Sequence, residues 1–274
     1  MAALYRESPA FGTFNALIPQ TVRALLDAQA PHRTVRILEL GAGTGGTTAH
    51  VVPSLDPPRT EYLVTDVGAY FLNHARATFG QHDFMRYAVL DVERTIAEQR
   101  WAHGRFDLII AANVLHATAD LEKTLANVRA LLNPGGVLLL LEGSQPRLWL
   151  DITFGLTEGW WLFRNHTLRP NYPLLPPSAW QRPLQAGGFD AVTATLPQGD
   201  FLMPQAVVMA RVPTKAQQLE QQDPWLFITT DEYGEQLVNA MRERGNRCMH
   251  AIVTDAVGAD AAHELRIANG DAKQ

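Results

Sequence analysis

The sequence predicts an α/β protein with a mostly parallel sheet and helices on both of its faces. Short apolar runs alternate with helix-like segments from residue 35 to residue 142, which is typical of repeated βαβ units. The runs are nearly continuous, as expected of strands that are buried on both faces. A glycine-rich turn follows the first run directly, and an aspartate follows each of the next two.

Each element has its own signal along the chain. A helix over 15–29 is predicted because its apolar residues gather on one face, namely Leu17, Ile18, Val22, Leu25 and Leu26. The expected strands lie at 35–40, 61–65, 85–90, 106–113 and 136–142, and the expected helices lie at 45–54, 69–79, 94–101 and 119–132. Two last strands, 190–196 and 205–212, are separated by turn residues and predict an antiparallel hairpin.

Three domains are expected: a leading helix in 1–34, a core over 35–216 and a third part over 217–274. Within the core, residues 143–188 are rich in tryptophan, proline and leucine and lack clean periodicity. They predict a lid over a substrate, although a hydrophobic segment docked on the core would have the same composition. The third part holds a polar linker and a single βαβ unit, which cannot bury a sheet alone. It is therefore expected to begin another domain of a larger protein.

The composition bounds the class of protein. A net charge of -5 and the lack of any Lys or Arg run give little support for a nucleic-acid partner. The single cysteine, Cys248, excludes an internal disulfide framework and a multi-cysteine zinc site, and it fits a reducing cytoplasm. The histidines lack the spacing of metal ligands, so no metal is expected. No signal peptide and no membrane-spanning stretch are found, so we expect a soluble, cytoplasmic protein without a membrane partner.

The glycine turn after residue 40 predicts a nucleotide-cofactor site. Gly41, Gly43 and Gly46 let the backbone turn sharply, approach a ligand and begin a helix. The same spacing also serves plain turns and dinucleotide sites, so the turn alone leaves the cofactor open. Asp66 and Asp91 follow the next two strands, where one acid can accept ribose hydroxyls and the other can bind an adenine amino group. Both could instead be ordinary cap or turn residues, but together they favour a cofactor that has adenosine without phosphate.

His116 and Glu142 are the candidate catalytic pair. Each follows an apolar strand, and the two strands are expected to be neighbours in the sheet. Ligands of open parallel sheets bind outside the carboxyl ends of the strands. A carboxylate beside an imidazole fixes the tautomer and raises the basicity of the ring, which makes a general base that works near neutral pH. Alternatively, these residues are a hydrogen-bonded core histidine and a salt-bridged strand-end acid.

The order of these acids and glycines resembles class I methyltransferases that use S-adenosylmethionine, over about residues 33–212. The resemblance implies a Rossmann-like seven-stranded methyltransferase sheet, mostly parallel with an antiparallel hairpin strand. It implies that Asp66 accepts the ribose hydroxyls and that Asp91 with Val92 holds the adenine. The cofactor residues that it implies are Glu39, Gly41, Gly43, Asp66, Val67, Asp91, Val92 and Asn113.

Three longer segments narrow the resemblance to methyltransferase domains of modular polyketide synthases. They are Ala-Ala-Asn-Val-Leu-His-Ala-Thr at 111–118, Asn-Pro-Gly-Gly-Val-Leu-Leu-Leu-Leu-Glu at 133–142 and Phe-Gly-Leu-Thr-Glu-Gly-Trp-Trp at 154–161. The resemblance implies that His116 and Glu142 serve as the base and that Trp160 helps to shape an acyl pocket. It also implies a substrate carried as a thioester on an acyl carrier protein, with neighbouring polyketide synthase domains in cis.

The resemblance leaves the methyl acceptor open. Carbon-methylating domains carry a large helical segment ahead of the core, whereas only residues 1–34 precede the first strand here. We therefore expect methylation of a β-hydroxyl oxygen, with methylation of the α-carbon of a β-ketoacyl intermediate as the alternative. The last βαβ unit resembles the first part of the structural half of a ketoreductase. A nicotinamide-dependent oxidoreductase and a decayed scaffold domain are the remaining alternatives, and Asp91 with the hairpin ending argues against the oxidoreductase.

Overall fold

The structure is a computed structural model of the 274-residue chain, and it describes residues 9–196, 204–217, 225–229, 232–243, 248–253 and 265–268. The chain divides into two compact units, Met1–Val212 and Pro213–Gln274. Each unit is described by itself below.

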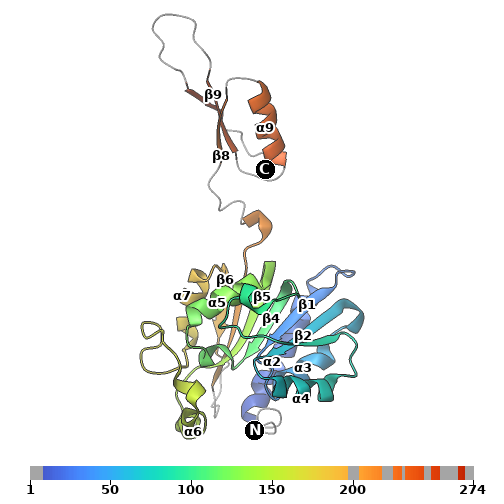
Figure 1. Cartoon of the computed structure of the whole chain (residues 1–274), viewed down its shortest axis with the longest axis vertical. Coiled ribbons are helices and arrows are strands. Elements are labelled where there is room, and N and C mark those ends of the chain that lie inside the picture. The colour runs from blue at the N-terminus through green and yellow to red at the C-terminus, as the bar shows by residue number, and fades with distance from the viewer. Residues whose placement is uncertain are drawn as a thin grey trace, which may run out of the picture. The chain divides into compact units, whose positions relative to one another are not determined.

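The first unit is built on a seven-stranded sheet with the order β3-β2-β1-β4-β5-β7-β6 (Figure 1). The strands are β1 (Val35–Leu40), β2 (Thr60–Asp66), β3 (Met85–Val89), β4 (Phe106–Ala112), β5 (Leu132–Gly143), β6 (Ala191–Thr195) and β7 (Gln205–Arg211). Strands β1 to β5 run parallel, and β7 runs antiparallel to both β5 and β6. The predicted fold class is confirmed, including the antiparallel hairpin.

Helices cover both faces of this sheet because successive strand residues point to opposite sides. Ile37 of β1 belongs to the same buried cluster as Ile18 and Val22 of α2, and the adjacent Leu38 belongs to the cluster that holds Leu125 of α5. The α-helices around the sheet are α2 (Pro9–Asp27), α3 (Gly46–Val51), α4 (Ala69–Phe79), α5 (Leu121–Ala130) and α7 (Gln181–Ala186). The short 3-10 turns are η1 (Val52–Ser54), η2 (Pro57–Arg59), η3 (Ile96–Gln99) and η4 (Leu115–Ala117).

Two details of the secondary structure differ from the prediction. The helix expected over 94–101 is wrong, since only the 3-10 turn η3 forms there. The Gln99 side chain folds back, accepting from the backbone nitrogen of Asp91 and donating to its carbonyl, and these bonds hold a loop instead of a helix. Strand β5 also begins at Leu132 rather than at residue 136, and it includes the Asn-Pro-Gly-Gly stretch. The register of β5 against β4 shifts between Phe106 and Leu108.

Residues 143–188, the lid segment, fold into short helices rather than one long one. They are α6 (Leu148–Thr153), η5 (Phe154–Leu156), η6 (Glu158–Trp161) and η7 (Pro177–Trp180), followed by α7. Leu150, Trp160 and Leu174 form a small buried cluster of their own. The segment therefore has a separate small core beside the sheet.

The second unit contains a βαβ arrangement with one added strand. Strand β8 (Trp225–Thr229) runs parallel to β9 (Cys248–Val253), and α9 (Glu232–Glu243) lies between them in the chain. Strand β10 (Leu265–Ala268) pairs antiparallel with β9, which the sequence analysis did not predict.

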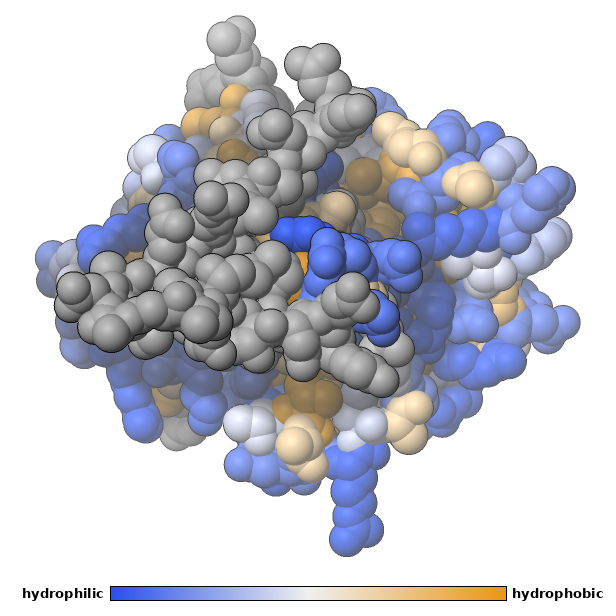
Figure 2. Space-filling view, turned by 90° about the horizontal axis from the view of Figure 1, so that it is seen from above, coloured by the Kyte–Doolittle hydropathy of each residue, from blue (hydrophilic) through white to orange (hydrophobic). Residues whose placement is uncertain are grey.

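The visible surface of the described residues in Figure 2 is mostly hydrophilic, with apolar residues in small separate groups. Within the described ranges, no helix is long and apolar enough to cross a membrane. The same residues include no cluster of three or more His, Cys, Asp or Glu side chains that could hold a metal ion.

Candidate active site

The turn after β1 depends on glycine at several positions. Gly41, Gly43 and Gly45 have φ angles of 59°, 52° and 77°, which residues with a side chain rarely adopt. A Cβ on Gly41 would lie 2.7 Å from Cγ2 of Val114, whereas the nearest atom to a Cβ on Gly43 would be a carbonyl oxygen at 3.8 Å. The turn is therefore closely packed at Gly41 and open at Gly43, where a ligand can reach the backbone.

Asp66 ends β2 and faces this turn. Its Oδ2 accepts a hydrogen bond from the Gly43 backbone nitrogen at 2.9 Å, and its Oδ1 accepts one from Gly68 at 2.8 Å. An ionised carboxylate has about four acceptor positions, so two remain for a ligand. The neighbouring Val67 has 68% of its surface exposed, which places an apolar side chain in solvent beside the carboxylate.

Glu39 lies beneath the turn, with an exposed fraction of 2%. Its Oε2 accepts hydrogen bonds from the hydroxyls of Thr48 at 2.7 Å and Tyr62 at 2.9 Å. Burial raises the pKa of Glu39 from 4.5 to about 7, and these hydrogen bonds oppose the rise only in part. Glu39 is thus poised to change charge near neutral pH.

Asp91 and Val92 form the loop after β3. Oδ1 of Asp91 accepts from the backbone nitrogen of Glu93 at 2.9 Å, which is a local turn contact of the kind that the sequence left as an alternative. Val92 is 7% exposed, and its carbonyl accepts from the Asn127 side chain at 2.8 Å. Glu93 reaches the loop after β4, where its Oε1 accepts from the backbone nitrogen of Ala119 at 2.7 Å.

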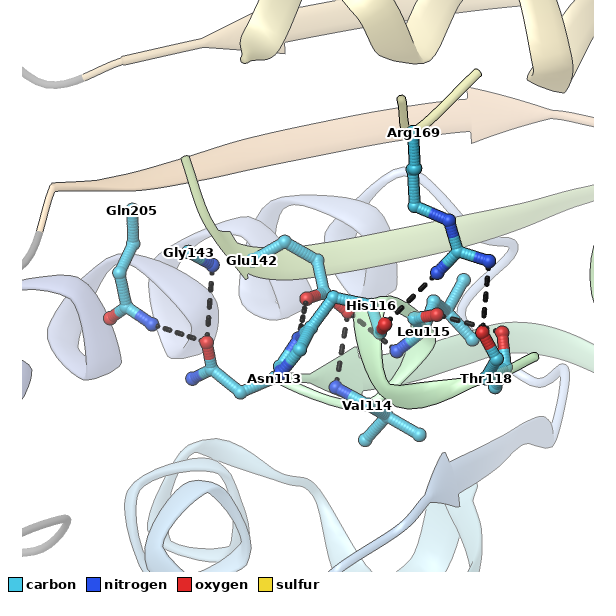
Figure 3. A network of polar contacts seen from close by, with 9 residues as sticks. All are labelled: Asn113, Val114, Leu115, His116, Thr118, Glu142, Gly143, Arg169 and Gln205. Atoms are coloured by element: carbon cyan, nitrogen blue, oxygen red, sulfur yellow. Dashed lines mark hydrogen bonds and ion pairs between the residues drawn. The ribbon is translucent and has the colours of Figure 1, made fainter. Parts of the chain in front are cut away.

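His116 and Glu142 are in direct contact at the carboxyl ends of β4 and β5. Nδ1 of His116 lies 2.6 Å from Oε2 of Glu142, and the other carboxylate oxygen accepts from the backbone nitrogens of Val114 and Leu115 (Figure 3). Glu142 is fully buried and His116 is 8% exposed. Because the carboxylate is already an acceptor for two amides, the ring donates its Nδ1 proton to it, and Nε2 remains the acceptor nitrogen.

Asn113 and Trp160 contact different parts of the site: Asn113 bonds the ends of neighbouring strands, and Trp160 packs on the imidazole of His116. Asn113 has a φ angle of 56°, and its Oδ1 accepts from the Gly143 backbone nitrogen at 3.2 Å and from Gln205 at 2.9 Å. The Trp160 ring meets the His116 ring edge to face, with centroids 5.4 Å apart. Trp160 therefore forms a wall beside the imidazole, while Asn113 ties together the ends of three strands.

Comparison with known proteins agrees with this geometry. A family model described as a methyltransferase domain matches residues 38–138. The chain is 39% identical to the polyketide synthase PksM of Bacillus subtilis over 197 residues, which are 69% of this chain and 5% of that protein. The structure of the CurJ carbon methyltransferase shares 40% identity and a TM-score of 0.74, covering 78% of this chain and 57% of that one. The CMeT domain of the citrinin polyketide synthase shares 31% identity and a TM-score of 0.71, covering 78% and 56%.

The chain contains an S-adenosylmethionine-dependent methyltransferase domain of the polyketide synthase type. This methyltransferase domain spans only 5% of PksM and little more than half of the two solved structures, at 57% and 56%.

The residues of the glycine turn fit the cofactor of this methyltransferase domain. The open backbone at Gly43 leaves room for close approach, and the two remaining acceptor positions of Asp66 suit a pair of ribose hydroxyls. Exposed Val67 can pack on a flat adenine ring. Glu39 is buried and is joined by hydrogen bonds to Thr48 of the helix that follows the turn and to Tyr62 of β2.

Four residues of the methyltransferase domain were not singled out from the sequence. Glu93, Arg169 and Gln205 bind the loops at the site by side-chain hydrogen bonds, and the Tyr172 hydroxyl donates to Asp151 within the lid segment. The pairing of β5 with β7 sets Gln205 opposite Gly143, so the predicted hairpin could have pointed to Gln205. For Arg169 the sequence held no signal, because the same segment also contains Arg147, Arg164 and Arg182.

Proposed function

We propose that this domain methylates the α-carbon of a β-ketoacyl chain carried as a thioester on an acyl carrier protein. The observation that carries the proposal is the contact between Glu142 and His116 at 2.6 Å, which builds a general base at the same sheet edge as the glycine turn. The likeness to carbon methyltransferases supports carbon as the acceptor.

The α-proton of a β-ketoacyl thioester is acidified by two carbonyl groups, so a positioned imidazole suffices to remove it. In this proposal Nε2 of His116 takes the proton, and Glu142 stabilises the imidazolium that forms. When bound, the cofactor supplies an electrophilic methyl group on a positively charged sulfur. Held by Asp66 and the glycine turn, the cofactor would supply this methyl group to the deprotonated α-carbon and would leave as a neutral thioether.

Methylation of a β-hydroxyl oxygen, which the sequence analysis favoured, is not supported by the comparisons. The short stretch ahead of the first strand does not distinguish the two acceptors, because this chain covers only 57% of the CurJ structure. The two acceptors are nevertheless separable by experiment.

The test is intact-protein mass spectrometry with isotopically labelled cofactor and three carrier-bound substrates. We expect a β-ketoacyl substrate to gain one labelled methyl group and a β-hydroxyacyl substrate to gain none. A β-ketoacyl substrate whose α-carbon already bears two methyl groups has no proton to lose and serves as the matched control. Methylation of the β-hydroxyacyl substrate alone would establish the oxygen acceptor instead.

The remaining assignments are part of the same proposal. Asp66 with Val67 would hold the ribose and adenine, Asp91 and Val92 would flank the adenine, and Glu39, Gly41, Gly43 and Asn113 would border the methionine part. Trp160 would form one wall of the acyl pocket. The domain would act within a cytoplasmic megasynthase, with the second unit as the first part of a ketoreductase.

A further inference from the structure

Arg169 is a fully buried arginine that comes from the lid segment. Its guanidinium donates to the carbonyl oxygens of His116 at 3.0 Å, Thr118 at 2.9 Å and Ala119 at 3.1 Å. A fourth bond, at 2.9 Å, goes to the side-chain oxygen of Asn165. Three of the four acceptors thus belong to the loop after β4 that carries His116, and Figure 3 draws the bonds to His116 and Thr118.

Asn165 strengthens this link between the lid segment and the loop. Its side-chain oxygen also accepts from the Leu121 backbone nitrogen at 2.7 Å, and its side-chain nitrogen donates to Asp120 at 2.9 Å. The backbone nitrogen of Arg164 adds a bond to the Ala119 carbonyl at 2.7 Å. The loop from 116 to 121 is therefore held from the lid side along its whole length.

The chemistry of Arg169 points to placement of the loop rather than to packing alone. Burial lowers the pKa of Arg169, which means that burying the charged guanidinium costs free energy. The nearby charges of Asp120, Glu142 and Glu93 offset part of that cost. An apolar side chain would fill the same volume without that cost. Only a planar guanidinium presents several donors in a fixed fork, which can bind three carbonyls of one loop at once.

We propose that Arg169 is a positioning residue for His116. It fixes the backbone of 116–119 from one side while Glu142 fixes the imidazole from the other. This inference rests on the proposed role of His116 as the base. The four hydrogen bonds of the Arg169 guanidinium go to the loop and to Asn165, and none of the four goes to the imidazole of His116 or the carboxylate of Glu142. Arg169 therefore acts through the loop.

The test compares Arg169→Lys and Arg169→Met with Arg182→Met, which removes an exposed arginine from the same segment. We expect kcat to fall on the order of a hundredfold in Arg169→Met, because a misplacement of about 1 Å costs that much. The affinity for S-adenosylhomocysteine should stay within about twofold, since the glycine turn is untouched. Arg169→Lys keeps the charge but loses the fork, so its kcat should also fall, whereas Arg182→Met should match the parent chain.

A second measurement reads the geometry without methyl transfer. The Nδ1 proton of His116, bonded to Glu142, gives a low-field proton resonance, and we expect it to shift or broaden in both Arg169 variants. An unshifted resonance with unchanged kcat in a folded Arg169→Lys would overturn the inference, even if Arg169→Met fails to fold. Normal turnover of a His116→Ala variant would instead overturn the proposed base, and the resonance comparison in the parent and Arg169 variants would still stand.

Discussion

The turn after β1 and the loop after β4 lie at the same edge of the sheet but are held in different ways. The turn takes its shape from its own backbone, with Gly41, Gly43 and Gly45 at positive φ. The loop takes its shape from side chains far away in the sequence. Glu142 lies 26 residues from His116, and Arg169 lies 53 residues from it.

The difference suggests how the two regions respond to change. A backbone-defined turn fails locally when a glycine gains a side chain, because no other residue can take over the conformation. A loop that is held by several distant side chains loses its conformation only in part when one partner is removed, because each partner fixes only part of the loop. Cofactor binding and acceptor deprotonation should therefore be separable by mutation.

The largest effect is expected for His116→Ala. Loss of a general base should reduce turnover on the order of 10²–10⁴, while binding of S-adenosylhomocysteine measured by calorimetry should not change. Steady-state turnover of carrier-bound substrate provides the measurement. If turnover stays within about threefold of the parent chain, the loop after β4 does not carry the base.

The second largest effect is expected for the free energy of unfolding, which should depend on pH because Glu39 takes up a proton. Its pKa rises from 4.5 unfolded to about 7 folded, so the folded state binds more proton between these values. The free energy of unfolding should therefore rise as the pH falls from about 7 towards 4.5, by about 3 kcal/mol for this group. Urea unfolding without cofactor, at about pH 5 and about pH 8, checks this against Glu39→Gln. Equal pH slopes for the parent and the variant would contradict it.

The third effect is expected for Asp66→Ala, which removes the acceptor for the Gly43 and Gly68 amides together with the proposed ribose contact. A loss of about 1–3 kcal/mol corresponds to weaker S-adenosylhomocysteine binding by about fivefold to about 150-fold. Titration calorimetry measures it, and the exposed Asp83→Ala is the matched control. Equal affinities in the two variants would remove Asp66 from the cofactor site.

The smallest effect is expected for Glu93→Gln, which acts on the loop after β4 from the loop after β3. Its Oε1 accepts from Ala119 at 2.7 Å, so neutralising it replaces a charge-assisted bond by an ordinary one. We expect a fall in kcat of about fivefold, equivalent to about 1 kcal/mol, with unchanged cofactor affinity. Glu61→Gln, at an exposed ion pair with Arg36, is the control and should leave kcat unchanged. A larger loss of affinity than of kcat would show that Glu93 acts on the cofactor side.

Much of the fold could be predicted because its signals are local. Continuous apolar runs indicated a parallel sheet that is covered on both faces, and the position of His116 and Glu142 at neighbouring strand ends suggested that they would meet. The helix expected over 94–101 failed because the side chain of Gln99 bonds the backbone of Asp91, and such a competing contact leaves no trace in periodicity.

Arg169 and Gln205 show why the rest of the site could not be predicted. The partners of Arg169 in the loop are backbone carbonyls, which every residue has, so no pairing pattern reveals them. Gln205 meets Asn113 across 92 residues, through the antiparallel placement of β7 beside β5. Contacts of this kind become visible only when the register of the sheet is known.

The close approach of Gly41 to Val114 bears on how domains of this type could change their acceptors over evolution. A Cβ on Gly41 would come within 2.7 Å of Val114, so the space between the turn and the loop is too small for an added methyl group. Any widening of that contact would alter both regions at once. We therefore expect new acceptor specificity to arise by substitution of lid-segment residues that bond neither the turn nor the loop, such as the exposed Leu148, Ile152 and Leu156.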